Sequence, residues 1–111
     1  MLCLLKRGTL NFFRKKNNTF ITLEEPDFSA ETRKLWGDLM FALEGQDVSQ
    51  VTIQLYDNGD LPLRVVSVLT ALGLKLASSS VQCDLKVSSQ TAQMLRRLNL
   101  TSAFANITEV Q

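Results

Sequence analysis

Residues 51–76, VTIQLYDNGDLPLRVVSVLTALGLKL, constrain the fold more than any other stretch of the chain. Val51, Ile53 and Leu55 alternate with polar residues, which is the pattern of a strand that buries one face. The sequence DNGD then favours a turn, and the long apolar segment after it predicts an amphipathic helix. A strand that runs directly into a helix is the building unit of α/β domains. Its loop and helix start usually present the surface that meets a ligand or a partner.

Single helices are predicted on either side of this unit. The first is expected to run from an N-cap at Ser29 to about Glu44. Its apolar stripe consists of Leu35, Trp36, Leu39, Met40 and Leu43. The last helix is expected to begin at Ser88 or Ser89 and to close at Asn99, because asparagine tolerates left-handed backbone.

The middle helix has several special positions. Asp60 is expected to cap it, and Pro62 is expected in its first turn, where a missing N–H group does little harm. Val68 and Leu74 widen its apolar face, so the helix is expected to be largely buried or to face a partner. Gly73 lowers the helix propensity and indicates either close packing or fraying at that point.

The remaining strand signals complete a mixed sheet. They fall at residues 1–7, 9–15, 19–24, 81–87 and 103–107. Lys16-Asn17-Asn18 is expected to form a hairpin turn, since asparagine tolerates left-handed geometry. Strands separated by single helices need parallel crossovers. The sequence therefore predicts one α/β domain over residues 1–111, with a mixed β-sheet, an N-terminal antiparallel hairpin and parallel strands joined by amphipathic helices.

The charge content of the chain limits its partners. Twelve basic and eleven acidic residues leave a formal net charge of +1, so no nucleic-acid partner is expected. No segment is long and apolar enough to predict a membrane span. Cations without an acid gather near the N-terminus: Lys6, Arg7, Arg14, Lys15 and Lys16. This cluster is expected to be a solvated hairpin or, alternatively, a docking patch for an acidic partner. Phe12 and Phe13 lie beside it, but two adjacent residues on a strand put at least one ring inside.

Catalytic and cofactor sites are not indicated. The chain has no histidine, which removes the usual base for a serine or cysteine nucleophile. Asp57 and Asp60 could bind a divalent cation or act as acid and base, but turn and capping roles are favoured for them. They flank the single Gly59, so they would repel an anion. Cys3 and Cys83 are expected to be buried free thiols, which suits a cytoplasmic protein. We therefore expect no enzyme activity, no metal and no cofactor.

From residue 9 onward, and especially over residues 51–104, the order of elements resembles the STAS domain of bacterial anti-sigma-factor antagonists. The matching parts are the strand VTIQLYD, the apolar helix after it, the strand VQCDLKV and the ending MLRRLNLTSAF. Family members end with a Leu-rich helix, a Gly-Leu pair and a Phe; here Leu95, Leu98, Asn99-Leu100 and Phe104 occupy those places. The resemblance implies a non-enzymatic regulatory domain whose partner is a kinase-like anti-sigma factor. Regulatory members carry a phosphorylated serine at the start of the helix after the central strand.

This chain departs from the family at that switch. No Ser or Thr occurs from Tyr56 to Val66, so a phosphoserine is chemically impossible there. Protein docking through the loop and helix start remains the expectation for this segment. The expected partner-binding residues are Asp57, Asn58, Gly59, Asp60, Leu61, Pro62, Leu63 and Arg64. The alternative that the resemblance leaves open is an accessory subunit of a lipid-transport ATPase, or a carrier of a small apolar ligand.

Overall fold

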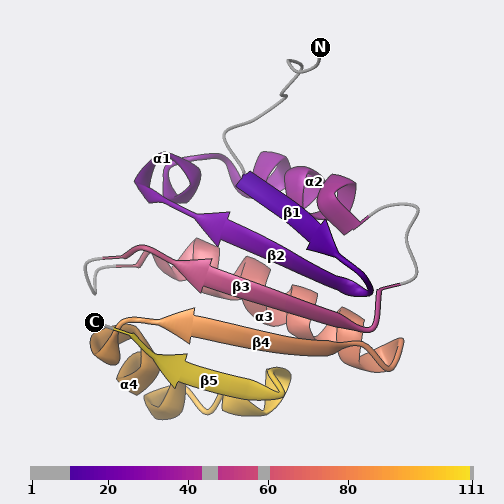
Figure 1. The fold of residues 1–111 in the computed structure, drawn as a ribbon. Coiled ribbons are helices and arrows are strands. Elements are labelled where there is room, and N and C mark those ends of the chain that lie inside the picture. Colours follow the sequence, from indigo (N-terminus) through magenta and orange to yellow (C-terminus); the bar gives the residue numbers. More distant parts are fainter. Residues whose placement is uncertain (1–10, 44–47, 58–60, 111) are drawn as a thin grey trace.

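The computed structural model describes residues 11–43, 48–57 and 61–110 (Figure 1). One sheet contains five strands, which lie side by side in chain order. They are β1 (Asn11–Lys15), β2 (Asn18–Leu23), β3 (Gln50–Leu55), β4 (Gln82–Val87) and β5 (Asn106–Glu109). β1 pairs with β2 in antiparallel orientation, and every later pair is parallel. This arrangement confirms the predicted mixed sheet with an N-terminal hairpin.

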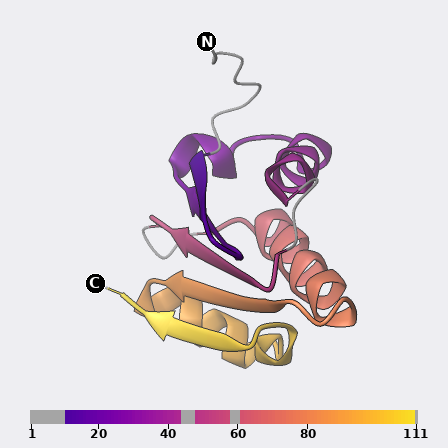
Figure 2. The ribbon, with the colours of Figure 1, turned by 45° about the vertical axis from the view of Figure 1, so that its right-hand side comes forward.

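The main helices form a second layer on one face of the sheet. The helices are α1 (Glu25–Phe28), α2 (Thr32–Leu43), α3 (Leu63–Ser78) and α4 (Ser89–Arg97), with the 3-10 turn η2 (Thr101–Ala103) before β5. α2, α3 and α4 lie behind the sheet in Figure 1; in Figure 2, α2 and α3 lie to its right and α4 lies behind β4 and β5. Each connects neighbouring parallel strands, and crossovers of the same hand keep successive helices on the same face. No helix among the described residues covers the opposite face of the sheet, which is called the open face below.

The core lies between these two layers. The pairing places Ile21 beside Ile53 and Ile53 beside Leu85, all on the helix side. Leu35 and Leu39 of α2 meet this row from the helix layer and are buried. α3 contributes the most buried residues: Val65, Val66, Val68, Leu69, Leu72, Gly73 and Leu76. The alternation read from the sequence therefore corresponds to the buried face of each parallel strand.

Two local predictions in the N-terminal half are wrong. Ser29 does not cap a long helix; it ends the short α1, and α2 begins only at Thr32. The short helix forms because the Asp27 carboxylate accepts a hydrogen bond from the Glu24 N–H at 2.8 Å. In the hairpin, the left-handed residue is Lys16, with φ 59°, rather than one of the asparagines. The predicted strand at 1–7, Cys3 and the end of the first helix at Glu44 lie outside the described residues.

The C-terminal half follows the sequence more closely. Ser88 is the N-cap of α4, since its hydroxyl accepts a hydrogen bond from the Thr91 N–H at 3.2 Å. Asn99 adopts the expected left-handed backbone, with φ 59°. Gly73 marks close packing and not fraying, because a side chain there would collide with the carbonyl oxygen of Ala103.

Candidate functional site

Asp57 connects the end of β3 to the start of α4. Its carboxylate accepts a hydrogen bond from the Ser88 hydroxyl at 2.8 Å and another from the Thr91 hydroxyl. The Ser88 backbone N–H points at the same carboxylate from 3.4 Å. Asp57 was predicted to act as a turn residue, but its partners lie more than 30 positions away in the chain. Its carboxylate therefore joins two neighbouring strand-to-helix connections.

The segment after Asp57 divides into buried and exposed parts. Asn58, Gly59 and Asp60 lie outside the described residues, and so does the predicted cap at Asp60. Leu61 is buried in the core, so its side chain is not available to a partner. Pro62 is half-buried and is the N-cap of α3. The helix begins at Leu63, two residues later than a cap at Asp60 predicts.

Leu63 and Arg64 are exposed members of the predicted site. The Leu63 side chain is 65% exposed, which is unusual for a leucine in the first turn of a buried helix. The Arg64 Nη2 atom donates a hydrogen bond to the Phe28 carbonyl at 2.8 Å. Arg64 therefore fixes the start of α3 to the end of α1, beside Leu63.

One side of α3 carries an exposed stripe. Leu74 is 56% exposed and lies eleven positions after Leu63, which is three helical turns, so both leucines lie on one side of the helix. Ser67 lies between them and is also exposed. These three residues are called the α3 stripe below. Val68, expected to widen the apolar face of this helix, is buried in the core.

A groove lies between α2 and the C-terminal part of α3. Its volume is about 770 Å³. It is lined by Lys34, Gly37, Asp38, Met40, Phe41, Leu43, Lys75 and Leu76. Phe41 is 63% exposed, and an ion pair between Lys34 Nζ and Asp38 Oδ2 at 3.0 Å lies at the rim. Its size is within the range of small-molecule sites.

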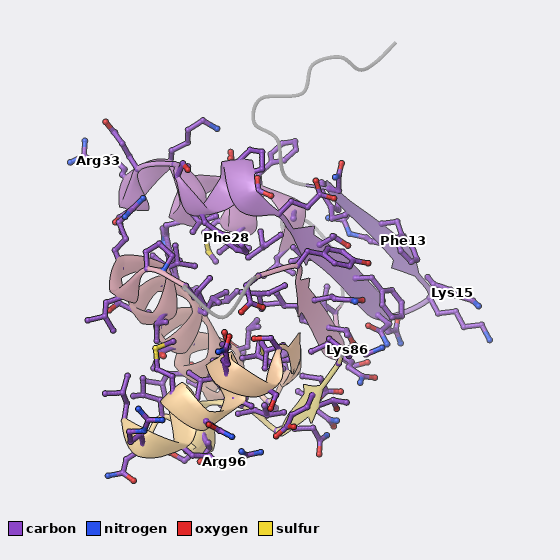
Figure 3. The ribbon with its side chains drawn as sticks, turned by 90° about the vertical axis from the view of Figure 1, so that its left-hand side faces the viewer. Phe13, Lys15, Phe28, Arg33, Lys86 and Arg96 are labelled. Carbon is purple, nitrogen blue, oxygen red and sulfur yellow. The ribbon has the colours of Figure 1, made fainter. Side chains whose placement is uncertain are left out.

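The open face of the sheet has aromatic, amide and cationic side chains. The rings of Phe13 and Phe20 stack across β1 and β2, with centroids 4.9 Å apart and an interplanar angle of 14°. Figure 3 shows Phe13, Lys15 and Lys86 pointing away from the helices. Of the other predicted N-terminal cations, Arg14 turns to the helix side and donates to the Ala42 carbonyl.

Amide side chains form a hydrogen-bonded row across four strands of this open face. Asn18 Nδ2 donates to Gln50 Oε1 at 3.1 Å, and Gln50 Nε2 donates to Asp84 Oδ2 at 2.7 Å. From the other side, Asn106 Nδ2 donates to Asp84 Oδ1 at 3.1 Å. The sequence analysis missed this row, because each of its members appears only as a polar residue in an alternating strand.

Cys83 faces the core from β4. Burial raises the pKa of its thiol from 9.0 to about 12, and the nearby Asp84 carboxylate adds to the shift. The buried free thiol was expected, and this pKa makes it a poor nucleophile. Among the described residues, no three His, Cys, Asp or Glu side chains gather in a group that could hold a metal. None of the described helices is long and apolar enough to cross a membrane.

The fold and these surfaces define a two-layer α/β domain with an exposed helix stripe on one side and an open polar sheet face on the other. Neither the protein-family models nor the curated proteins contain a match to the sequence. The STAS resemblance therefore stays a prediction.

Proposed function

We propose that the protein is a non-enzymatic, STAS-like regulatory domain of the cytoplasm that docks another protein through the start of α3. The observation that supports this most is Leu63, which is 65% exposed at the first turn of α3. It lies in the segment that the sequence analysis selected as the partner surface. In such a domain the partner is a kinase-like anti-sigma factor.

Exposed leucines on one side of a helix favour association. Burying a leucine side chain completely is worth about 1.5–3 kcal/mol, so covering the exposed parts of Leu63 and Leu74 contributes roughly 2–3 kcal/mol. That is enough for a change of about 30-fold or more in affinity. Arg64 helps to orient the partner at this surface, because its guanidinium is fixed by a hydrogen bond to the Phe28 carbonyl.

Serine phosphorylation within residues 56–66 cannot regulate this interaction, because that segment contains no serine. From residue 56 to residue 66 the chain has no hydroxyl that could carry a phosphate other than the phenol of Tyr56. The nearest serine on α3 is Ser67, which is exposed within the stripe itself. We therefore expect binding to the partner to be constitutive unless another part of the domain is modified.

Quantitative affinity purification from the source cell tests this proposal. The bait is compared with Leu63→Arg and with a matched control, Leu98→Arg, whose leucine is 46% exposed at the end of α4. The proposal expects a kinase-like anti-sigma factor that Leu63→Arg loses by tenfold or more and Leu98→Arg retains. Equal recovery with both variants would remove the start of α3 from the interface.

The groove between α2 and α3 supports a second candidate, a carrier of a small apolar ligand or an accessory subunit of a lipid-transport ATPase. Phe41 and Met40 give the groove an apolar floor of suitable size. Native mass spectrometry of the purified protein would show an added mass under this candidate, and Phe41→Asp would remove it. Purification would then recover a transporter subunit in place of a kinase.

A further inference from the structure

The open face of the sheet is more positive than the net charge of the chain suggests. Lys15 on β1 and Lys86 on β4 both point out of this face, and Lys16 lies at the adjoining turn (Figure 3). Asp84 is the one carboxylate on the open side of the paired strand residues that the structure describes. Within the described chain, neither ion pair involves a lysine of this face. The face is therefore positive, although the chain as a whole is only +1.

The Asp84 carboxylate has several hydrogen-bond donors around it. Its carboxylate accepts hydrogen bonds from Gln50 at 2.7 Å, from Asn106 at 3.1 Å and from Gln82 at 3.3 Å. These hydrogen bonds hold the carboxylate within the row of amide side chains. The lysines on either side of Asp84 remain available to an anionic partner.

Aromatic rings lie on the same face. The sequence analysis expected one ring of the Phe12–Phe13 pair to be inside, and Phe12 is indeed half-buried against the core. Phe13, however, is 59% exposed, and the ring of Phe20 stacks beside it from the next strand. The two rings stack on each other, and the exposed Phe13 ring on the edge strand can extend this stack to a base next to Lys15. This stacked pair is called the Phe13–Phe20 platform below.

A shallow hollow beside this platform has groups for the rest of a nucleotide. Its volume is about 320 Å³. It is lined by Lys15, Lys16, Asn17, Asn18, Phe20, Ser49 and Gln50. The Asn18 Oδ1 atom is buried there and has no hydrogen-bond partner within the described part of the chain. Amide groups match the donor and acceptor edges of bases, and lysines match phosphates.

We propose that the open face of the sheet binds single-stranded nucleic acid, with bases on the Phe13–Phe20 platform and phosphates at Lys15, Lys16 and Lys86. This revises the expectation of no nucleic-acid partner, which depended on the net charge and on one ring of the Phe12–Phe13 pair lying inside. A second copy of the chain is disfavoured on this face, because two positive faces repel each other. An acidic protein segment would use the lysines but would leave the stacked rings without a partner.

Fluorescence anisotropy with labelled 12-nucleotide oligo(dT) and oligo(U) tests the proposal on the intact chain. We expect binding at 50 mM salt that weakens by about 15-fold at 200 mM, since three phosphate contacts give a logarithmic slope of about −2. Phe13→Ala should weaken binding by roughly tenfold or more through lost stacking. Lys86→Glu should weaken it by about fivefold or more and reduce the salt slope.

The matched control is Lys75→Glu on α3, which lies in the helix layer and should leave binding unchanged. The changed side chains of Phe13 and Lys86 are exposed, so circular dichroism should show unaltered folds. Absence of oligonucleotide binding at 50 mM salt overturns the proposal. A poly-glutamate peptide of equal length provides a second test. If it displaces the oligonucleotide and binds wild type and Phe13→Ala with equal affinity, the proposal is also overturned, since the surface would then recognise charge alone.

Discussion

Gly73 offers a sharp test of how tightly α3 packs on the C-terminal turn. It is buried on α3, and a Cβ atom at this position would collide with the Ala103 carbonyl of η2. The same atom would lie 3.0 Å and 3.1 Å from two ring carbons of Phe104, which is itself buried. In a helix without such neighbours, replacing glycine by alanine stabilises by about 1 kcal/mol. Gly73→Ala therefore sets helix propensity against a steric clash.

We expect the steric clash to dominate. Overpacking a core by one methyl group costs about 1–3 kcal/mol when the neighbours cannot rotate away. The nearest obstacle is a backbone carbonyl, which moves only if η2 moves with it. After the gain in helix propensity is subtracted from the upper part of that range, Gly73→Ala should destabilise the domain by roughly 1–2 kcal/mol.

Gly37 on α2 is the matched control. A Cβ atom there meets nothing within 4 Å, so Gly37→Ala should stabilise by about 0.5–1 kcal/mol. Urea unfolding, followed by circular dichroism, should show midpoints that move in opposite directions with unchanged m-values. A Gly73→Ala variant as stable as Gly37→Ala would refute the close approach of α3 to η2.

Two further predictions concern other buried groups. Asp57→Ala should lower the free energy of unfolding by about 2–3 kcal/mol, because it removes charged hydrogen bonds and leaves the buried Thr91 hydroxyl without this acceptor. When Asp57→Ala is combined with Ser88→Ala, urea unfolding should show a loss smaller than the sum of the two single losses. Additive losses would argue against the contact. In a Cys3→Ser background, a thiol reagent at pH 8 should label Cys83 only on unfolding. Because the native pKa is about 12 and the reference value is 9.0, the free energy of unfolding should fall as the pH rises between them, by at most about 1.4 kcal/mol per pH unit. Cys83→Ala should remove that component, and rapid labelling of the native protein would contradict the burial.

The fold could be predicted from the sequence wherever its cause is local. Strands β3 and β4 follow from the alternation of apolar and polar residues, and α4 follows from a serine cap and an asparagine stop. Parallel order follows from single helices between the strands. The errors also have local causes. The hydrogen bond from the Glu24 N–H to Asp27 forms a short helix before the predicted one, and Lys16 takes the left-handed turn position expected of an asparagine. Residue propensity alone does not predict such boundaries.

The surfaces could be predicted only in part, because they depend on which strands become neighbours. Leu63, one of the predicted partner-binding positions, is exposed, whereas the burial of nearby Leu61 depends on how α3 sits on the sheet. Asp57 has the sequence of a turn residue, and only the pairing of β3 with β4 brings Ser88 within hydrogen-bond distance. The Phe13–Phe20 pair likewise arises from the register of the hairpin.

The two proposed surfaces lie on opposite layers, so their occupants can be tested independently. The α3 stripe lies on the helix layer, while Lys86 and Phe13 point out of the open sheet face (Figure 3). The buried core lies between them, and none of the described hydrogen bonds or ion pairs involves Leu63 or Lys86 side chains. Leu63→Arg should therefore reduce protein docking without changing oligonucleotide affinity, and Lys86→Glu should do the reverse. A variant on one layer that weakened both interactions by similar factors would indicate one shared interface and would contradict the assignment of two separate surfaces.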